Sequence, residues 1–205
     1  MMINPIFYLV TLTLVNGVCF LDKKSLSNKI IMIILINYFL TELVSIYLNY
    51  NNIAVGLLFN ISILLQFSMW ILLLLTVFKK QKNIFIYLYL CLALISLWNH
   101  FNEFNNVNFI IGTAIYASIY ISESFKLLQN ENLAFFQTNL FLLISAPLIF
   151  FFGLSLMFAF NTHELSTHIV FFNIKLYTFI NYFVNIVCYT LINYFIFKEK
   201  KIKND

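Results

Sequence analysis

Five side chains suited to metal binding or proton transfer lie in two polar segments, residues 99–106 and 161–168, between long apolar runs. They are His100, Glu103, His163, Glu164 and His168. Imidazole and carboxylate groups bind divalent metals, and imidazole changes its charge near neutral pH. These residues are therefore candidates for a metal or pH-sensing site. The alternative is the ordinary polarity of solvated loops.

The segment from His163 to His168 resembles the HExxH motif of zinc proteases but has one residue too many. A spacing of five turns the second histidine about 140° away from the first around a helix. A spacing of four would place both ligands on one face, so the protease interpretation fails. No other nucleophile, base or metal set converges, and the sequence predicts neither an enzyme nor a cofactor.

Two ionisable residues, Glu42 and Lys175, interrupt apolar runs instead of lying between them. Charged groups inside a membrane are costly and are usually paired or functional. Each lies about six residues from the same end of the bundle, which at ~1.5 Å per residue places both roughly 9 Å deep. We expect them to form an ion pair or to share a polar cavity. Alternatively, Lys175 extends toward the membrane boundary and Glu42 is neutral and hydrogen-bonded.

Uncharged polar residues occur within the same apolar runs. The candidates for a ligand-binding or coupling site are Glu42, Lys175, Gln66, Asn60, Asn181 and Asn185. In the last run, asparagine and tyrosine recur at steps of four from Asn173 to Asn193, and each step drifts about 40° around a helix. These residues predict either hydrogen bonds that join helices or the lining of a ligand pocket.

Small residues recur at every fourth position in part of residues 107–125. Ala114, Ser118 and Ser122 share one face of a helix in that run. Small side chains let helices approach closely in a membrane, so this stripe predicts the packing face of that helix.

The composition defines the elements that must position these side chains. Apolar residues make up 62% of the 205 residues and charged residues 10%, against about 45–50% and about 25% in soluble domains. A soluble monomer could not cover so much apolar surface. Soluble enzymes, disordered chains and disulfide-rich secreted proteins are therefore excluded, and we predict an all-α, polytopic membrane protein.

Seven apolar runs are candidates for membrane-spanning helices, each needing about 20 residues. They are residues 5–20, 30–48, 53–78, 84–98, 107–125, 134–160 and a stretch within 169–197. We expect one transmembrane domain over residues 1–197 and a basic tail at 198–205. Since little of the chain remains for loops, we expect any signal to the cytoplasm to pass through a partner.

The lysines predict how the helices are oriented. Lysine supplies all 12 basic residues, and every lysine except Lys175 follows the first, third, fifth or seventh predicted helix. Positive residues concentrate in cytoplasmic loops, so we expect the N-terminus outside and the C-terminal tail in the cytoplasm. The lipid bilayer is then the principal partner, in a bacterial inner membrane. Such short clusters between apolar runs do not indicate nucleic-acid binding.

Three stretches carry a resemblance to known proteins. They are residues 41–45 (TELVS), 59–67 (FNISILLQF) and 112–125, which includes Glu123. With them the chain resembles small, uncharacterised bacterial seven-helix membrane proteins, which are similar to the membrane regions of some sensor histidine kinases. The resemblance implies no known substrate. In those proteins the position of Gln66 is often Glu, so acid chemistry at this position is not expected here.

Two functions remain open for such a bundle. One is a receptor-like sensor or accessory module that binds a small or lipid ligand between its helices and acts through a cytoplasmic signalling protein. The alternative is a small-solute or proton-coupled transporter that uses Glu42. The lack of a broken helix pair or an inverted repeat favours the sensor.

Overall fold

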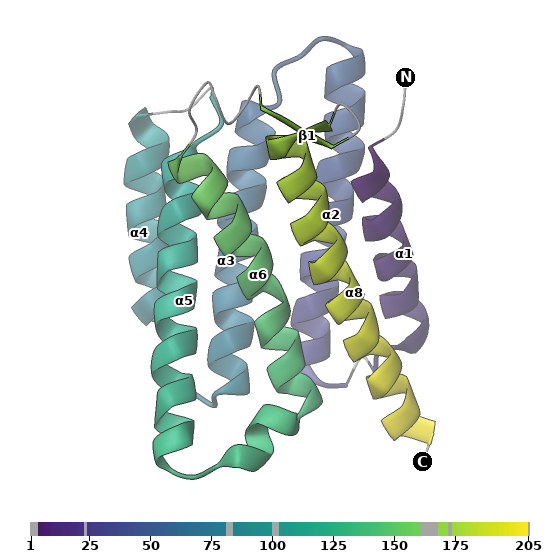
Figure 1. Cartoon of the computed structure of the whole chain (residues 1–205), viewed down its shortest axis with the longest axis vertical. Helices are drawn as coiled ribbons and strands as arrows, with labels where there is room; N and C mark the ends of the chain where they lie inside the picture. The colour runs from purple at the N-terminus through teal and green to yellow at the C-terminus, as the bar shows by residue number, and fades with distance from the viewer. Residues whose placement is uncertain are drawn as a thin grey trace.

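The computed structural model describes residues 4–22, 24–80, 84–99, 103–160, 168–171 and 174–204. Apart from one short hairpin, the described residues fold into helices (Figure 1), which confirms the all-α prediction. The elements are α1 (Pro5–Phe20), α2 (Leu26–Tyr50), α3 (Gly56–Val77), α4 (Ile84–Asn99), α5 (Asn106–Gln129), the 3-10 helix η1 (Leu133–Gln137), α6 (Asn139–Ala159), β1 (Ile169–Phe171), β2 (Ile174–Lys175) and α8 (Leu176–Asn204).

Polar residues at the helix starts explain where several helices begin. Asn4 precedes Pro5, and its side-chain oxygen accepts a hydrogen bond of 3.1 Å from a backbone N–H of the first turn of α1. Asn105 and Thr138 cap α5 and α6 in the same way, at 3.0 and 3.2 Å. Such caps satisfy N–H groups that have no partner within the helix.

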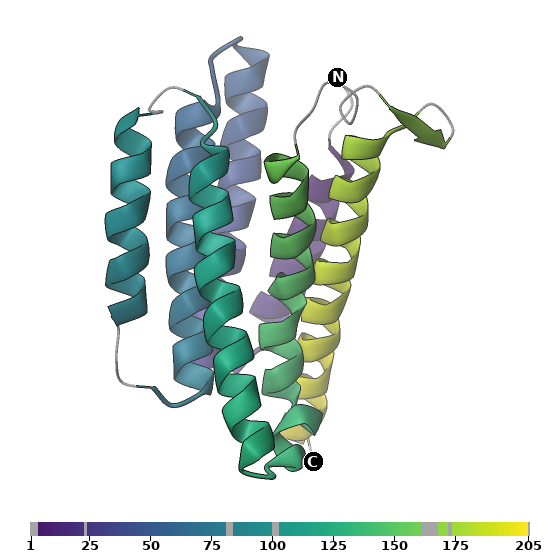
Figure 2. The same cartoon turned by 60° about the vertical axis from the view of Figure 1, so that its left-hand side comes forward.

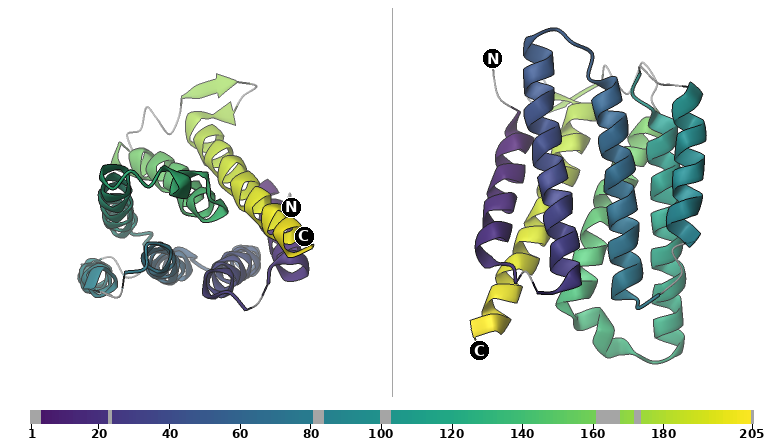
Figure 3. Two further views of the ribbon diagram at one scale, coloured as in Figure 1. Left: turned by 90° about the horizontal axis from the view of Figure 1, so that it is seen from below. Right: turned by 180° about the vertical axis from the view of Figure 1, so that it is seen from behind.

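Six helices form a ring, and α4 packs on its outside (Figures 1 and 3). Around the ring α1, α2, α3, α5, α6 and α8 are successive neighbours, and α8 packs back against α1. α4 lies against α3 and α5, and Figure 2 shows it on the side away from α6 and α8. The closed ring lets residues of α2, α3 and α8 face the same interior space, although α8 is distant from the other two in sequence.

Four helices in the described part of the chain are long and apolar enough to cross a membrane. They are α2, α3, α6 and the part of α8 from Leu176 to Lys201. α1 and α4 are apolar but have 16 residues each, about 24 Å of helix at ~1.5 Å per residue, against roughly 30 Å of hydrocarbon. The bundle therefore has several candidate spans, and the seven-span topology stays a prediction.

The two ends of the bundle differ in charge. The α1–α2, α3–α4 and α5–α6 connections and the C-terminus lie at the lower end in Figure 1, with the N-terminus at the other. The lower end holds Lys24, Lys79, Lys80 and Lys126, whose side chains are all exposed. We call it the lysine end.

The last apolar run divides into a hairpin and a helix. β1 and β2 pair antiparallel, with Ile169 opposite Lys175, and α8 starts at Leu176. Lys175 therefore precedes the helix, which corrects the expectation that it lies about two turns inside the last span. The sequence missed this boundary because Ile, Val and Phe fill strands and apolar helices alike. At the C-terminal end of the chain, the residues expected to form a basic tail instead continue α8 as far as Asn204.

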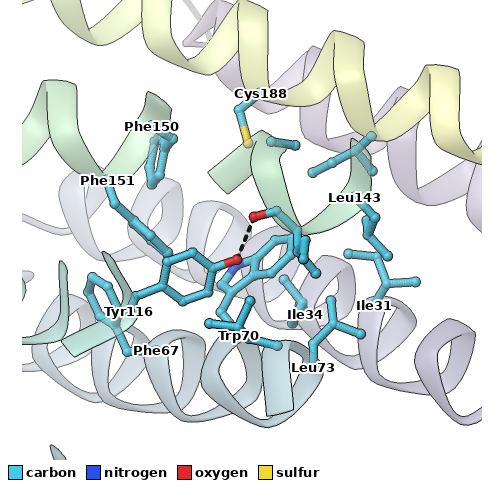
Figure 4. Close-up of a cluster of buried hydrophobic side chains, with 14 of the residues drawn as sticks. Ile31, Ile34, Phe67, Trp70, Leu73, Tyr116, Leu143, Phe150, Phe151 and Cys188 are labelled. Carbon is cyan, nitrogen blue, oxygen red and sulfur yellow. Dashed lines mark hydrogen bonds between the residues drawn. The ribbon is translucent and has the colours of Figure 1, made fainter. Parts of the chain in front are cut away.

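Aromatic residues fill the centre of the bundle, as Figure 4 shows around Trp70 and Tyr116. Both are fully buried. Phe67 stacks on Phe151 with ring centroids 4.3 Å apart, which joins α3 to α6. The Tyr116 hydroxyl donates a hydrogen bond of 2.7 Å to the carbonyl oxygen of Ile144, in the turn of α6 before Pro147. Pro147 has no main-chain N–H and cannot donate a hydrogen bond within α6. The hydrogen bond from Tyr116 ties the turn of α6 that precedes Pro147 to α5.

Candidate functional site

A pocket of about 630 Å³ lies between the helices, toward the end opposite the lysine end. All six helices of the ring line it, together with Asn4, Val55 and the segment before α5, and none of its lining residues comes from α4. Its volume falls in the range of roughly 300–1,000 Å³ that is common for small-molecule sites. The pocket extends from the helix ends into the bundle, as far as Gln66 on α3 and Tyr189 on α8.

Four of the six predicted site residues line this pocket. Glu42 comes from α2, Gln66 from α3, and Asn181 and Asn185 from α8. The other two, Asn60 and Lys175, are not among its lining residues. The structure therefore gathers side chains from three helices that the sequence alone could not place together.

Hydrogen bonds centred on Ser62 hold α2 against α3 at the wall of the pocket. The Ser62 hydroxyl lies 2.7 Å from that of Thr41 and accepts from the amide nitrogens of Asn37 and Gln66, at 3.2 and 3.1 Å. Thr41, Ser62 and Gln66 also line the pocket. The two alternatives raised by the sequence, joining helices and lining a pocket, thus apply to the same residues.

Asn60 is a positioning residue for the segment before α5. It is fully buried. Its amide nitrogen donates to the carbonyl oxygen of Glu103 at 2.7 Å, and its oxygen accepts from the backbone N–H of Asn105 at 2.9 Å. Because Glu103 and Phe104 line the pocket, Asn60 shapes the pocket without facing it.

Glu42 places a carboxyl group at the pocket, and no described residue pairs an opposite charge with it. It is half-buried, and no described side chain donates a hydrogen bond to its carboxyl group or pairs with it. The ion pairs of the described residues join Glu123 to Lys80 and Lys126, at 3.0 and 2.7 Å. Lys175 is exposed in β2, and no ion pair connects it to Glu42 in the described part of the chain.

Aromatic rings form much of the remaining pocket wall. Phe109 and Phe158 lie 5.2 Å apart between ring centroids, and Phe104 lies 5.1 Å from Phe158. Tyr177 and Tyr189 face the pocket from α8. The phenylalanines could not be found from sequence, because 25 phenylalanines are spread through the chain and only the fold selects these few.

The polar stripe of α8 divides between two tasks. From Tyr177 to Tyr189 its members line the pocket. One turn further, Asn193 donates to the hydroxyl of Thr13 at 2.7 Å and accepts from the amide of Asn16 at 2.8 Å, which joins α8 to α1. This division follows from the drift of a four-residue step around the helix.

The residues proposed for a metal site are only partly described. Glu103 is exposed at the pocket, and His168 is exposed just before β1. His100 and His163 lie outside the described residues. Within the described ranges no group of three metal-binding side chains comes together.

Comparisons of the chain with models of protein families, with curated proteins and with solved structures found no match. The function must therefore be argued from the pocket itself. The resemblance to the membrane regions of sensor kinases stays a prediction.

Proposed function

We propose that the protein is a multi-pass membrane receptor or accessory module that binds a small or lipid ligand in the pocket and acts through a partner protein. One observation carries the proposal: residues of α2, α3 and α8 meet at a pocket of about 630 Å³. The lysine distribution supports an orientation in which the pocket opens outside and the lysine end faces the cytoplasm. In that orientation ligand and partner meet opposite ends of one bundle.

Ligand occupancy is tested by filling the pocket. Leu154 lines it from α6, whereas Leu156, on the same helix, is 55% exposed. Native mass spectrometry of the chain purified from its own membranes should show a bound small molecule or lipid with wild type and Leu156→Trp, and none with Leu154→Trp. A bound species that the wild type and both variants retain equally would contradict binding in the pocket.

The alternative is a transporter that uses Glu42, and a flux assay separates it from a receptor. The purified chain is reconstituted in liposomes that contain a pH-sensitive dye, and a proton gradient is imposed. If the protein is a receptor, the proton gradient should decay at the same rate as in liposomes without protein. Glu131→Gln, at the lysine end, is the control. Proton flux that is lost in Glu42→Gln and kept in Glu131→Gln would contradict the receptor proposal and favour transport.

A further inference from the structure

We propose that the ligand of this pocket is an organic cation, an ammonium-type group carried on an apolar body. This inference rests on the proposed function and specifies the class of ligand. It follows from the charge, the aromatic wall and the hydrogen-bonding groups of the pocket.

The described lining residues that can carry a full charge near neutral pH are both acidic. Glu42 and Glu103 both line it, and no lysine is among its described lining residues. A half-buried carboxylate is costly unless an opposite charge or hydrogen-bond donors compensate it. Since the described chain supplies neither to Glu42, a bound cation is the missing partner.

The wall of the pocket suits a cation with an apolar surface. Aromatic rings attract cations through the negative face of their π system, within about 6 Å of the ring centre. Phe104, Phe109 and Phe158 supply such rings near one another, and Tyr177 and Tyr189 add two more from α8. Aromatic carbon does not coordinate hard metal ions, which prefer several oxygen ligands, so the lining favours an organic cation over a metal.

The amide side chains leave oxygen atoms for the ligand. The amide nitrogen of Asn185 donates to the main-chain and side-chain oxygens of Asn181, at 2.8 and 2.9 Å. The amide nitrogen of Gln66 donates to Ser62 at 3.1 Å. Among the hydrogen bonds of the described residues none takes the side-chain oxygens of Asn185 and Gln66, so both can accept from an N–H or a polarised C–H of a ligand.

The experiment uses three probes of similar shape and different charge: benzyltrimethylammonium, its neutral carbon analogue neopentylbenzene, and the anion phenylmethanesulfonate. Equilibrium binding to the full chain is measured in an uncharged detergent, with binding to empty micelles subtracted. We expect saturable binding of one cation per chain and at least about tenfold weaker binding of the neutral and anionic probes.

Variants assign the cation to the pocket. Glu42→Gln should weaken cation binding at least about tenfold, whereas Glu42→Asp, which keeps the charge, should stay within about threefold of wild type. Glu131→Gln removes the same charge at the lysine end and should change nothing. An unfolding midpoint of Glu42→Gln equal to that of wild type excludes a folding defect as the cause of its loss, and near-wild-type binding by Glu42→Asp shows that the charge is what matters.

Results that differ from these expectations have defined meanings. Equal binding of the neutral probe and the cation, unchanged in Glu42→Gln, would overturn the cation assignment and leave a ligand pocket in place. Saturable binding of none of the three probes by the folded chain would also overturn the assignment. Cation binding that persists in Leu154→Trp would lie outside the pocket and would count against the proposed function as well.

Discussion

Individual polar side chains have distinct roles around the pocket. Glu42 and Asn185 face it, Ser62 both faces it and joins two helices, and Asn60 supports it from behind. Residue type could predict that these side chains avoid lipid, because each is polar in an apolar run. It could not predict which of them face a ligand, because that depends on how α2, α3 and α8 are rotated against one another.

Removal of the Asn60 side chain tests its supporting role. Asn60→Ala deletes hydrogen bonds to the backbone of Glu103 and Asn105 and leaves buried polar groups without partners. We expect a loss of about 1–3 kcal/mol in unfolding free energy, together with faster hydrogen exchange at the Asn105 amide. Asn51→Ala, at an exposed turn, is the control and should change stability by less than about 0.5 kcal/mol. Equal unfolding free energies of Asn60→Ala and Asn51→Ala would contradict the supporting role of Asn60.

Among the helices, each of the seven apolar runs contains an α-helix in the described part of the chain, although η1 and the β1–β2 hairpin were not predicted. Long apolar stretches separated by short polar ones allow little else in a chain of this composition. The packing faces were harder to predict. Ala114, Ser118 and Ser122 are exposed. The prediction that they form the face by which α5 packs against other helices of this chain is therefore wrong. α5 instead packs through Gly112 and Tyr116, since large buried side chains such as Phe67 lie on that side.

The contact between α6 and α8 depends on a glycine. A Cβ atom added at Gly153 would lie 2.5 Å from Cγ1 of Val184, and a β-branched side chain has little freedom to move away. We expect Gly153→Ala to reduce the unfolding free energy by about 1–3 kcal/mol through overpacking. Thermal or denaturant unfolding in detergent measures this change.

Two further variants make the Gly153 prediction specific. The double variant Gly153→Ala with Val184→Ala removes the clashing methyl groups and should recover part of the loss. Ser118→Ala, at an exposed position of α5, should stay within about 0.5 kcal/mol of wild type. If Gly153→Ala were as stable as Ser118→Ala, close approach of α6 and α8 would not depend on this glycine.

At the scale of the whole molecule, the two ends of the bundle are chemically different. One end holds Lys24, Lys79, Lys80 and Lys126, and the pocket lies toward the other end, where the one described lysine is Lys175 in β2. The lysine pattern predicted this separation because alternate connections of an antiparallel bundle lie at the same end. The sequence suggested a polar cavity, but the full set of residues that line the pocket could not be predicted, because they come from six helices that meet only when the ring closes.

The orientation in the membrane is tested by labelling with an impermeant maleimide in intact cells. Cys19, Cys91 and Cys188 are first replaced by alanine, because two of them are exposed. Single cysteines then replace Asn52, in the α2–α3 turn, and Asn130, in the turn after α5. We expect Asn52→Cys to react from outside and Asn130→Cys to react only after lysis. The reverse pattern would contradict the proposed orientation.

The reactivity of one cysteine inside the pocket tests the proposed binding site most directly. Asn181→Cys, in the same cysteine-free background, is treated from outside intact cells with thiosulfonate reagents of similar size that carry a trimethylammonium or a sulfonate group. A thiolate itself attracts the cationic reagent, so the ratio of the cation's rate to the anion's rate is compared with the same ratio for a free thiol in solution. We predict that the ratio at Asn181→Cys exceeds the free-thiol ratio about tenfold or more, and that Glu42→Gln removes most of this excess. A ratio equal to that of the free thiol, or no reaction from outside, would contradict an outward-opening, cation-selective pocket.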